Sequence, residues 1–212
     1  MVSFFKHGVS RYLLLIPFLT YSLAFASCDD DDDDSSASYA IDDIQDGEVV
    51  SAFNKLNAVR ANPSAYSSEM GVDLSGIEAS DALVWDACLA KAAQQKAEDM
   101  ANKNYFSHVD HDGYGMNYRI YKAGYALPEA WYSTKSLNYF ENIAAGYSTG
   151  EATIKQLIYD SGADLDAAGH RQSLLSTTDF RSNCNDIGIG HAYNSNSDYR
   201  HYWVIVIAKH DY

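Results

Sequence analysis

Hydrophobic residues recur at helical spacing early in the chain and at every second position near its end. The first periodic segment contains Val49, Phe53 and Leu56, which fall on one face of a helix. This spacing predicts a helix over residues 41–59. Pro63 would stop it, because the residue before a proline avoids the helical backbone region.

A second periodic segment predicts a helix over residues 81–102. One apolar stripe along this segment would pack against the core, and charged residues would lie on the opposite face. The stripe consists of Trp85, Leu89, Ala92 and Met100, and the residues expected to face solvent are Lys91, Lys96 and Glu98.

A third helix is expected to begin near Ser148, which together with Glu151 has the spacing of a capping box. Gly162 would end this helix, and a short helix is expected over residues 170–175. The segment from 105 to 139 lacks clear periodicity and is long for a connection, which is typical of functional loops. The buried face of the third helix would consist of Ile154, Leu157 and Ile158.

The C-terminal region changes to the pattern of strands. Apolar or aromatic residues alternate from Ile187 to Tyr193, and a continuous apolar run follows from Tyr202 to Ala208. A continuous run predicts a central strand covered on both faces, with the turn over residues 194–198. Helices flanking an antiparallel sheet define an α+β fold.

The N-terminus reads as a targeting segment followed by a tether. Residues 1–27 have the basic start and short apolar stretch of a signal peptide. They end in a sequence that resembles the lipobox of bacterial lipoproteins, so Cys28 is the expected lipidation site. The alternative is a plain signal peptide cleaved near Ala26. Residues 28–40 would then form an acidic flexible tether, and residues 41–212 the folded domain.

Charge narrows the range of partners. The formal net charge is −14 at pH 7, so nucleic acid is not an expected partner, because phosphate binding needs a basic face. The predicted contact with a membrane is the lipid at Cys28. This places the protein outside the cytoplasm, anchored to the outer membrane. The aspartates from Asp29 to Asp34 resemble the export signals of some surface-exposed lipoproteins.

Three distant residues are the best candidates for chemistry: His108, Glu141 and His170. Two imidazole nitrogens and one carboxylate would suit a divalent metal such as zinc, if the fold brings them together. The same groups would also suit an acid, a base and an orienting residue. A third interpretation is that Glu141 only holds a loop in place by accepting backbone hydrogen bonds.

The order of these motifs resembles the CAP superfamily, also called SCP, which includes cysteine-rich secretory proteins, insect venom antigens and plant pathogenesis-related proteins. The resemblance extends from about Val49 to Ala208. It implies a three-layer α-β-α sandwich and a cleft tetrad of two histidines and two acids, with Asp160 as the fourth member. The matching segments are Asn57 to Arg60, Leu83 to Asp86 with Leu89-Ala90, Phe106-Ser107-His108, Glu141-Asn142-Ile143, Gly169-His170-Arg171 and Gly188-Ile189-Gly190.

The cysteines, a short acidic segment and the C-terminal histidines allow further expectations. Cys88 and Cys184 would be a possible disulfide pair in an oxidising compartment, and two separate buried thiols are the alternative. The segment from Asp110 to Gly113 is expected to be a polar turn rather than a calcium loop. The remaining histidines near the C-terminus, His191, His201 and His210, are expected to be surface residues without an acidic partner.

Two functions follow from this. The first is a non-enzymatic domain that binds a small apolar ligand, a lipid or a protein partner, as the resemblance implies for some family members. The abundance of tyrosine, 17 residues, would suit such a contact surface. The alternative is a metal-dependent hydrolase or peptidase in which His108, His170 and Glu141 hold the metal and Asp160 activates water. The chain has no Gly-x-Ser-x-Gly or His-Glu-x-x-His motif.

Overall fold

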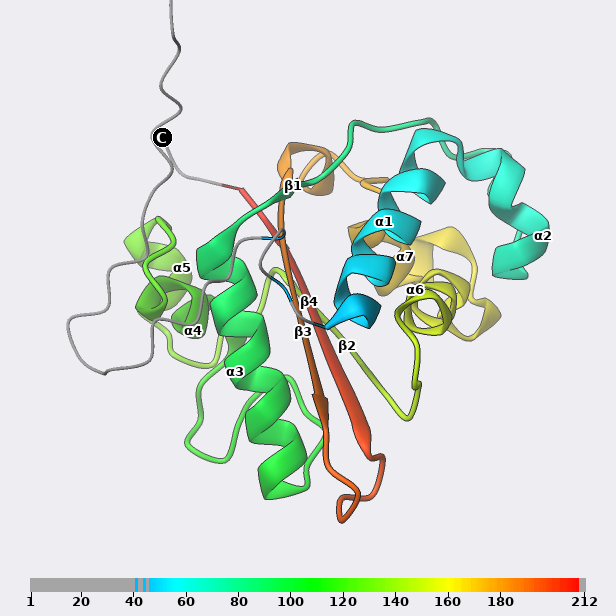
Figure 1. Cartoon of the computed structure of the whole chain (residues 1–212). Helices are drawn as coiled ribbons and strands as arrows, with labels where there is room; N and C mark the ends of the chain where they lie inside the picture. The colour runs from blue at the N-terminus through cyan, green and yellow to red at the C-terminus, as the bar shows by residue number, and fades with distance from the viewer. Residues whose placement is uncertain (1–40, 42–43, 45, 210–212) are drawn as a thin grey trace, which may run out of the picture.

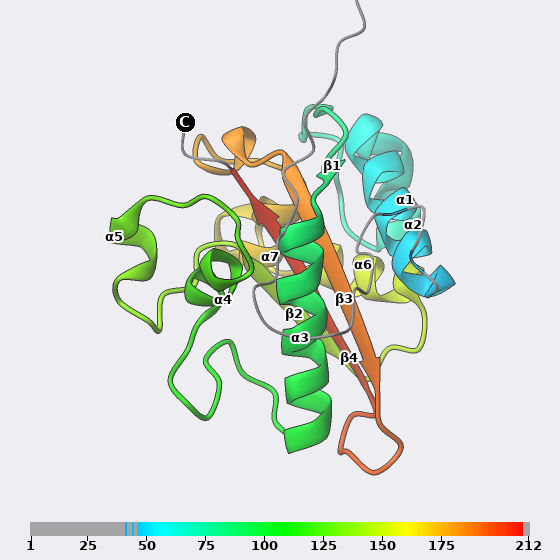
Figure 2. The ribbon, with the colours of Figure 1, turned by 60° about the vertical axis from the view of Figure 1, so that its left-hand side comes forward.

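The structure is a computed structural model that describes residues 41, 44 and 46–209. The predicted signal peptide, Cys28, the tether up to residue 40 and His210 lie outside the described residues. In the described part, helices cover both faces of one sheet (Figure 1 and Figure 2). The α+β class and the three-layer α-β-α sandwich predicted from the sequence are confirmed.

The two helical layers differ in size. On one face the long helix α3 packs along the sheet, with α4 and α5 beside it (Figure 1). On the other face α1, α6 and α7 lie together, and α2 contacts α6. The helices are α1 (Gly47–Ala61), α2 (Ser67–Met70), α3 (Ala87–Lys103), α4 (Met116–Lys122), α5 (Glu129–Tyr132), α6 (Gly150–Tyr159) and α7 (Gly169–Leu174).

The sheet has four strands in the order β1-β3-β4-β2. β4 pairs antiparallel with both neighbours, as predicted. β1 pairs parallel with β3, so the sheet is mixed rather than purely antiparallel. β2 was not predicted as a strand from the sequence, and it forms one edge. The strands are β1 (Val84–Trp85), β2 (Glu141–Ala145), β3 (Asp186–Tyr193) and β4 (His201–Ala208).

The centre of the sheet is almost fully buried. The residues of β4 from Tyr202 to Ala208 have 0% exposure, which confirms the prediction of a central strand. On one side α3 lies directly on the backbone of β3. A Cβ atom at Gly188 would be 2.1 Å from the Ala90 nitrogen, and one at Gly190 would be 2.3 Å from the Ala93 carbonyl carbon. Glycine at both positions therefore permits this close contact.

Two predicted helix starts were wrong. α1 begins at Gly47 because Asp46 caps it, accepting a hydrogen bond from the Glu48 N–H. α3 begins only at Ala87 because Val84 and Trp85 form β1 instead. The pairing partners of β1 lie far along the chain at the start of β3. Helical spacing alone did not reveal this pairing.

The third predicted helix is present as α6, with different ends. Thr149, not Ser148, is its N-cap and accepts a hydrogen bond from the Ala152 N–H. The helix ends at Tyr159, before the predicted stop at Gly162, because Asp160 adopts the left-handed conformation. The segment from 105 to 139 also differs from expectation, since it contains α4 and α5. Short 3-10 turns complete the fold at Pro63–Tyr66, Asp160–Gly162, Leu165–Ala167 and Arg181–Asn183.

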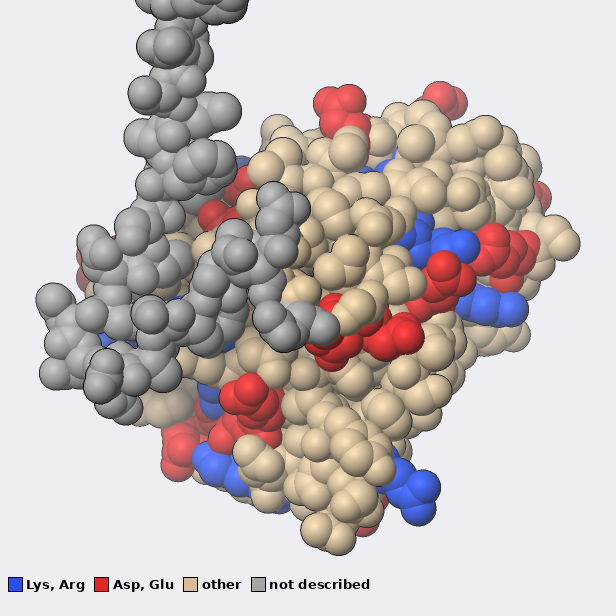
Figure 3. Space-filling model, viewed as in Figure 1, with Lys and Arg blue, Asp and Glu red and all other residues tan. Residues whose placement is uncertain are grey.

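The surface is acidic in character but mixed in detail. On the face shown in Figure 3, lysine and arginine side chains are scattered, and several lie beside acids. Lys55, for example, is in ion pairs with Glu69 and Glu151, which join α1 to α2 and α6. Within the described residues, none of the helices has the length and apolar composition required to span a membrane.

Candidate functional site

The first histidine pair joins a loop to an edge strand. His108 lies in the loop after α3, and Glu141 is the first residue of β2. The Nδ1 atom of His108 is 2.7 Å from Oε2 of Glu141. The imidazole is 46% exposed, whereas the carboxylate is completely buried. The pair therefore presents a histidine ring to solvent and orients it from below by a buried acid.

Asn138 contacts both residues of this pair, and the sequence did not reveal it. Its Oδ1 accepts a hydrogen bond from the Glu141 backbone N–H, which fixes the orientation of the amide. Its Nδ2 lies 2.9 Å from Nδ1 of His108 and 3.4 Å from Oε2 of Glu141. Nδ1 of His108 accepts a hydrogen bond from Asn138 only if it carries no proton, and it donates one to Glu141 only if it does. The tautomer of His108 therefore decides which of these contacts are hydrogen bonds.

Glu141 is held in an unfavourable environment for its charge. Burial raises the pKa of its carboxyl group, while the hydrogen bond to His108 and the charge of Lys96 oppose the shift. Its second oxygen, Oε1, is buried and has no hydrogen-bond partner among the described residues. An unpartnered buried oxygen is costly, which distinguishes Glu141 from an acid that merely holds a loop.

The second histidine pair lies where α6 passes into α7. Asp160 caps the C-terminus of α6 with φ 46° and ψ 51°. Its Oδ1 is 2.9 Å from Nδ1 of His170, and its Oδ2 accepts a hydrogen bond from the His170 backbone N–H at 2.9 Å. The left-handed turn thus directs one short carboxylate onto both the ring and the backbone of the histidine. The His170 side chain is 35% exposed.

Buried polar side chains fix both pairs from behind. Arg171, fully enclosed next to His170, donates hydrogen bonds to the carbonyls of Ile158, Tyr159 and Ala163 and so ties α7 to the end of α6. Asn142, next to Glu141, donates to Ser173 on α7 and to a carbonyl of β4. Arg171 and Asn142, which are the neighbours of His170 and Glu141 in the sequence motifs, therefore have a structural role.

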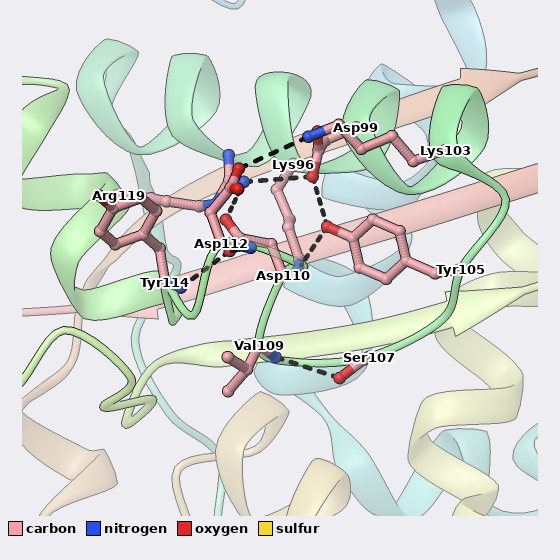
Figure 4. A network of polar contacts seen from close by, with 10 residues as sticks. All are labelled: Lys96, Asp99, Lys103, Tyr105, Ser107, Val109, Asp110, Asp112, Tyr114 and Arg119. Carbon is pink, nitrogen blue, oxygen red and sulfur yellow. Dashed lines mark hydrogen bonds and ion pairs between the residues drawn. The ribbon is translucent and has the colours of Figure 1, made fainter.

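The loop that carries His108 is fastened to α3 by a polar network (Figure 4). Tyr105 donates a hydrogen bond to Asp99 at 2.5 Å, and Asp110 forms an ion pair with Arg119, which also contacts Asp99. Hydrogen bonds and the charge of Arg119 outweigh burial and lower the pKa of Asp110. Because these groups flank His108 on both sides, the network positions the loop.

The position of Lys96 differs from the prediction. It was expected to face solvent, but it has 0% exposure and donates a hydrogen bond to the Tyr105 hydroxyl at 3.0 Å. Burial lowers its pKa, and the charge of Glu141 acts against that shift. The polar turn predicted from Asp110 to Gly113 is confirmed, since Oδ1 of Asp110 accepts hydrogen bonds from the Asp112 and Tyr114 N–H groups.

The two pairs do not combine into a metal-ligand set. In the part of the chain that the structure describes, no three His, Cys, Asp or Glu side chains are grouped so that they hold a metal ion. The Nδ1 atoms of both histidines face carboxylates, which leaves Nε2 as the ring nitrogen available to a ligand. A catalytic zinc site requires three protein ligands, so the arrangement of His108, Glu141 and His170 does not fit one.

The possible disulfide is not formed. Cys184 is a free, buried cysteine, and its thiol donates to the Phe180 carbonyl at 3.5 Å. Burial raises its pKa, which makes the thiol unreactive. The bridge between Cys88 and Cys184 was therefore wrong, and the alternative of a buried thiol is correct for Cys184.

Two cavities lie near the second pair. One of about 370 Å³ lies between α2 and α6, and its lining includes Met70, Tyr147 and Tyr159. Tyr159 directly precedes Asp160. A cavity of about 530 Å³ lies at the end of α1, beside Arg60. None of the four predicted site residues lines either cavity.

A three-layer α-β-α sandwich with two histidine–acid pairs, one at an edge strand and one at a helix junction, defines a CAP-type domain. A sequence model of the family described as "CAP: Cysteine-rich secretory protein family" matches residues 53–207. The chain belongs to this family.

Individual proteins of other organisms are also similar to this chain. The chain is similar to the uncharacterized protein YkwD of Bacillus subtilis (strain 168), with 30% identity over 142 residues. The match covers 65% of this chain but only 47% of the length of YkwD. Among solved structures, it resembles an outer surface protein from Borrelia burgdorferi, with a TM-score of 0.51, 15% identity, and coverage of 79% of this chain and 96% of the other.

A second solved structure is an extracellular protein containing a SCP domain from Bacillus anthracis str. Ames. Its TM-score is 0.46 and its identity 23%, and the match covers 80% of this chain and 43% of that one.

Proposed function

We propose that this chain is an extracytoplasmic, lipid-anchored CAP-domain protein that binds a small apolar ligand, a lipid or a protein partner without catalysing a reaction. Its binding site is built around the His108 and His170 pairs. The observation that carries the proposal is the same for both: a partly exposed imidazole is oriented by a carboxylate at Nδ1, which leaves the outer face of the ring for a ligand.

The surroundings of the pairs support binding rather than catalysis. Ser107 precedes His108, but its hydroxyl accepts a hydrogen bond from the Val109 N–H and so belongs to the turn. A hydrolase that uses a metal would need a three-ligand set, and the described side chains do not form one. The cavity between α2 and α6 offers apolar surface, and its lining includes Tyr159, which directly precedes Asp160 in the chain.

The placement outside the cytoplasm rests on the predicted signal peptide and on Cys28. The structural neighbour from Borrelia burgdorferi is an outer surface protein, which agrees with this placement. A lipid at Cys28 would hold the domain at the membrane through the acidic tether of residues 28–40. Two-dimensional diffusion there would keep a membrane-derived ligand at high local concentration.

The test compares bound lipids between variants. The full chain is purified from membranes in mild detergent, and the co-purifying lipids are extracted and measured by mass spectrometry. His108→Ala combined with His170→Ala should lose the specific lipid, while the exposed control His111→Ala retains it. An unchanged lipid profile in the double variant would overturn the site.

A parallel measurement addresses the hydrolase alternative. Zinc is titrated into the wild-type chain, and binding is followed by calorimetry. Stoichiometric binding that the same double variant abolishes, together with hydrolysis of a peptide substrate, would replace the binding proposal by the metal-dependent enzyme.

A further inference from the structure

Two histidines that belong to neither histidine–acid pair, His191 and His201, lie side by side near the turn of the β3–β4 hairpin. Nε2 of His191 is 3.1 Å from Nδ1 of His201, and the two rings are parallel within 1°. On its other side, Nδ1 of His191 is 2.6 Å from Oδ2 of Asp46. The prediction that His191 lacks an acidic partner was wrong, because Asp46 is remote in sequence.

The environment keeps His191 in place. Its side chain is 10% exposed, and its ring stacks on Trp203 with centroids 4.0 Å apart. The side chain of Gln94 on α3 bonds to both the N–H and the carbonyl of His191. The ring of His201 also contacts that of Tyr193, with centroids 4.8 Å apart.

The charged groups around the pair come from three elements. Asp46 at the start of α1 contributes a negative charge, and Arg200, directly before β4, a positive one. From α3, Glu98 approaches through its hydrogen bond with Gln94. Burial lowers the pKa of His201, and the neighbouring His191 and Arg200 lower it further.

The contact between the rings of His191 and His201 depends on how many protons the two rings carry. With both rings neutral, the His191 Nδ1–H bonds to Asp46, so Nε2 accepts the Nδ1–H of His201. One added proton is also accommodated: His191 becomes an imidazolium between Asp46 and an acceptor nitrogen of His201. A second proton places hydrogens on both facing nitrogens, and the hydrogen bond between the rings is lost. The contact between the rings therefore requires that at least one of the two facing nitrogens carries no proton.

Asp46 extends this chain of contacts into α1. Its Oδ1 caps the helix by accepting from the Glu48 N–H, while its Oδ2 faces His191. The single aspartate thus joins the first turn of α1 to the hairpin on which both histidines lie. Residues 28–40, the predicted tether, precede this junction in the sequence.

We propose that Asp46, His191 and His201 form a pH-sensitive latch that fastens the start of α1 to the β3–β4 hairpin and loses its His201 contact when the pair takes up a second proton. Loss of the contact between the two rings frees the end of β4 that carries His201, whereas the hydrogen bond between Asp46 and His191 does not depend on that second proton. The device responds to acid on the outside of the cell, independently of the ligand-binding pairs.

Histidine titration tests the proton count on the full chain. The ring signals of the wild-type protein are followed by NMR from pH 8 to pH 4. His201 should titrate below its ordinary value, and His191→Phe, which retains the stack on Trp203, should move that titration upward. A His201 titration at or above the ordinary value, or one unaffected by His191→Phe, would overturn the latch.

Amide exchange tests the opening itself. The reporters are the Asn194 and Gly146 N–H groups, which bond to the carbonyls of Arg200 and His201. After correction for intrinsic exchange rates, their protection should fall on acidification. The fall should be about tenfold for each unit by which the pKa of His201 in contact with His191 differs from its pKa after that contact is lost. The fall should be absent in His201→Phe and unchanged in the control His111→Phe. Equal loss of protection in His201→Phe would contradict the proposal.

Discussion

Glu141 offers one carboxylate oxygen to Nδ1 of His108 at 2.7 Å and buries the other without a hydrogen-bond partner among the described residues. The packing of the protein therefore disfavours the charged form of this carboxyl group. Such groups are common at binding sites and active sites, where stability is exchanged for a defined electrostatic environment.

Replacing Glu141 by Gln should stabilise the fold, increasingly so as the pH rises. Burial raises the folded-state pKa above that of the unfolded chain. The contribution of Glu141 to stability is therefore present in acid and is lost as pH rises from the unfolded value through the folded one. Thermal unfolding followed by circular dichroism from pH 4 to pH 8 measures the effect, at about 2–4 °C in Tm per kcal/mol.

The matched control for that series is Glu78→Gln, which changes an exposed acid in the same way. It should leave the difference in Tm nearly constant with pH. A constant difference for Glu141→Gln as well would mean that the acid is not destabilised by burial.

Tyr105→Phe should destabilise the domain and loosen the loop of His108. The hydroxyl accepts from the buried Lys96 and donates to Asp99, so its removal leaves both charges short of a partner. The expected cost is about 1–3 kcal/mol in urea unfolding. Tyr193→Phe, at a side chain that is 60% exposed, should cost less than about 0.5 kcal/mol. Equal effects of the two variants would show that the network does not stabilise the loop.

Substitutions of Asp160 should follow the order Asn, Gly, Ala in increasing cost. Asn tolerates the left-handed conformation and keeps an acceptor for the His170 N–H, while Gly keeps only the conformation. Ala loses the hydrogen bonds and adds about 1–2 kcal/mol of backbone strain. Urea unfolding of the three variants measures the order, and an Ala variant as stable as the Gly variant would exclude strain at this position.

Cys28→Ala should release the protein from the membrane fraction or leave it unprocessed. The lipid at Cys28 would be the anchor, because the sequence predicts a lipobox at this cysteine and an acidic tether after it. Cell fractionation and mass spectrometry of the mature N-terminus measure the outcome. Cys184→Ala, which changes a buried free thiol, should remain membrane-bound. Acylated, membrane-bound Cys28→Ala protein would disprove the anchor.

The sequence predicted those elements whose pattern is local. Helices α1, α3 and α6 and strand β4 were recognisable because their apolar spacing records the face that each buries. Strands β1 and β2 were missed because they are short and acquire their identity from distant partners in β3 and β4. Lys96 was misplaced because its burial depends on Tyr105, which lies beyond the helix that carries it.

The site shows the same division. His108, Glu141, Asp160 and His170 were predicted as site residues through the family resemblance, and the structure arranges them as two pairs. Asn138 was not identifiable, since a single amide in a loop carries no pattern of its own. The link between Asp46 and His191 was also hidden, because it joins residues 145 positions apart.

The direct contact between α3 and β3 has a mechanical consequence. Where helix and strand meet through Gly188 and Gly190, no intervening side chains exist to change rotamer and let one element slide over the other. The two elements therefore move as one rigid body, which supports the loop of His108 at one end and the ring of His191 along its length. Motion at the proposed ligand site would then arise in the opposite layer, where α7 and His170 are held to α6 by the hydrogen bonds of Arg171 and Asp160.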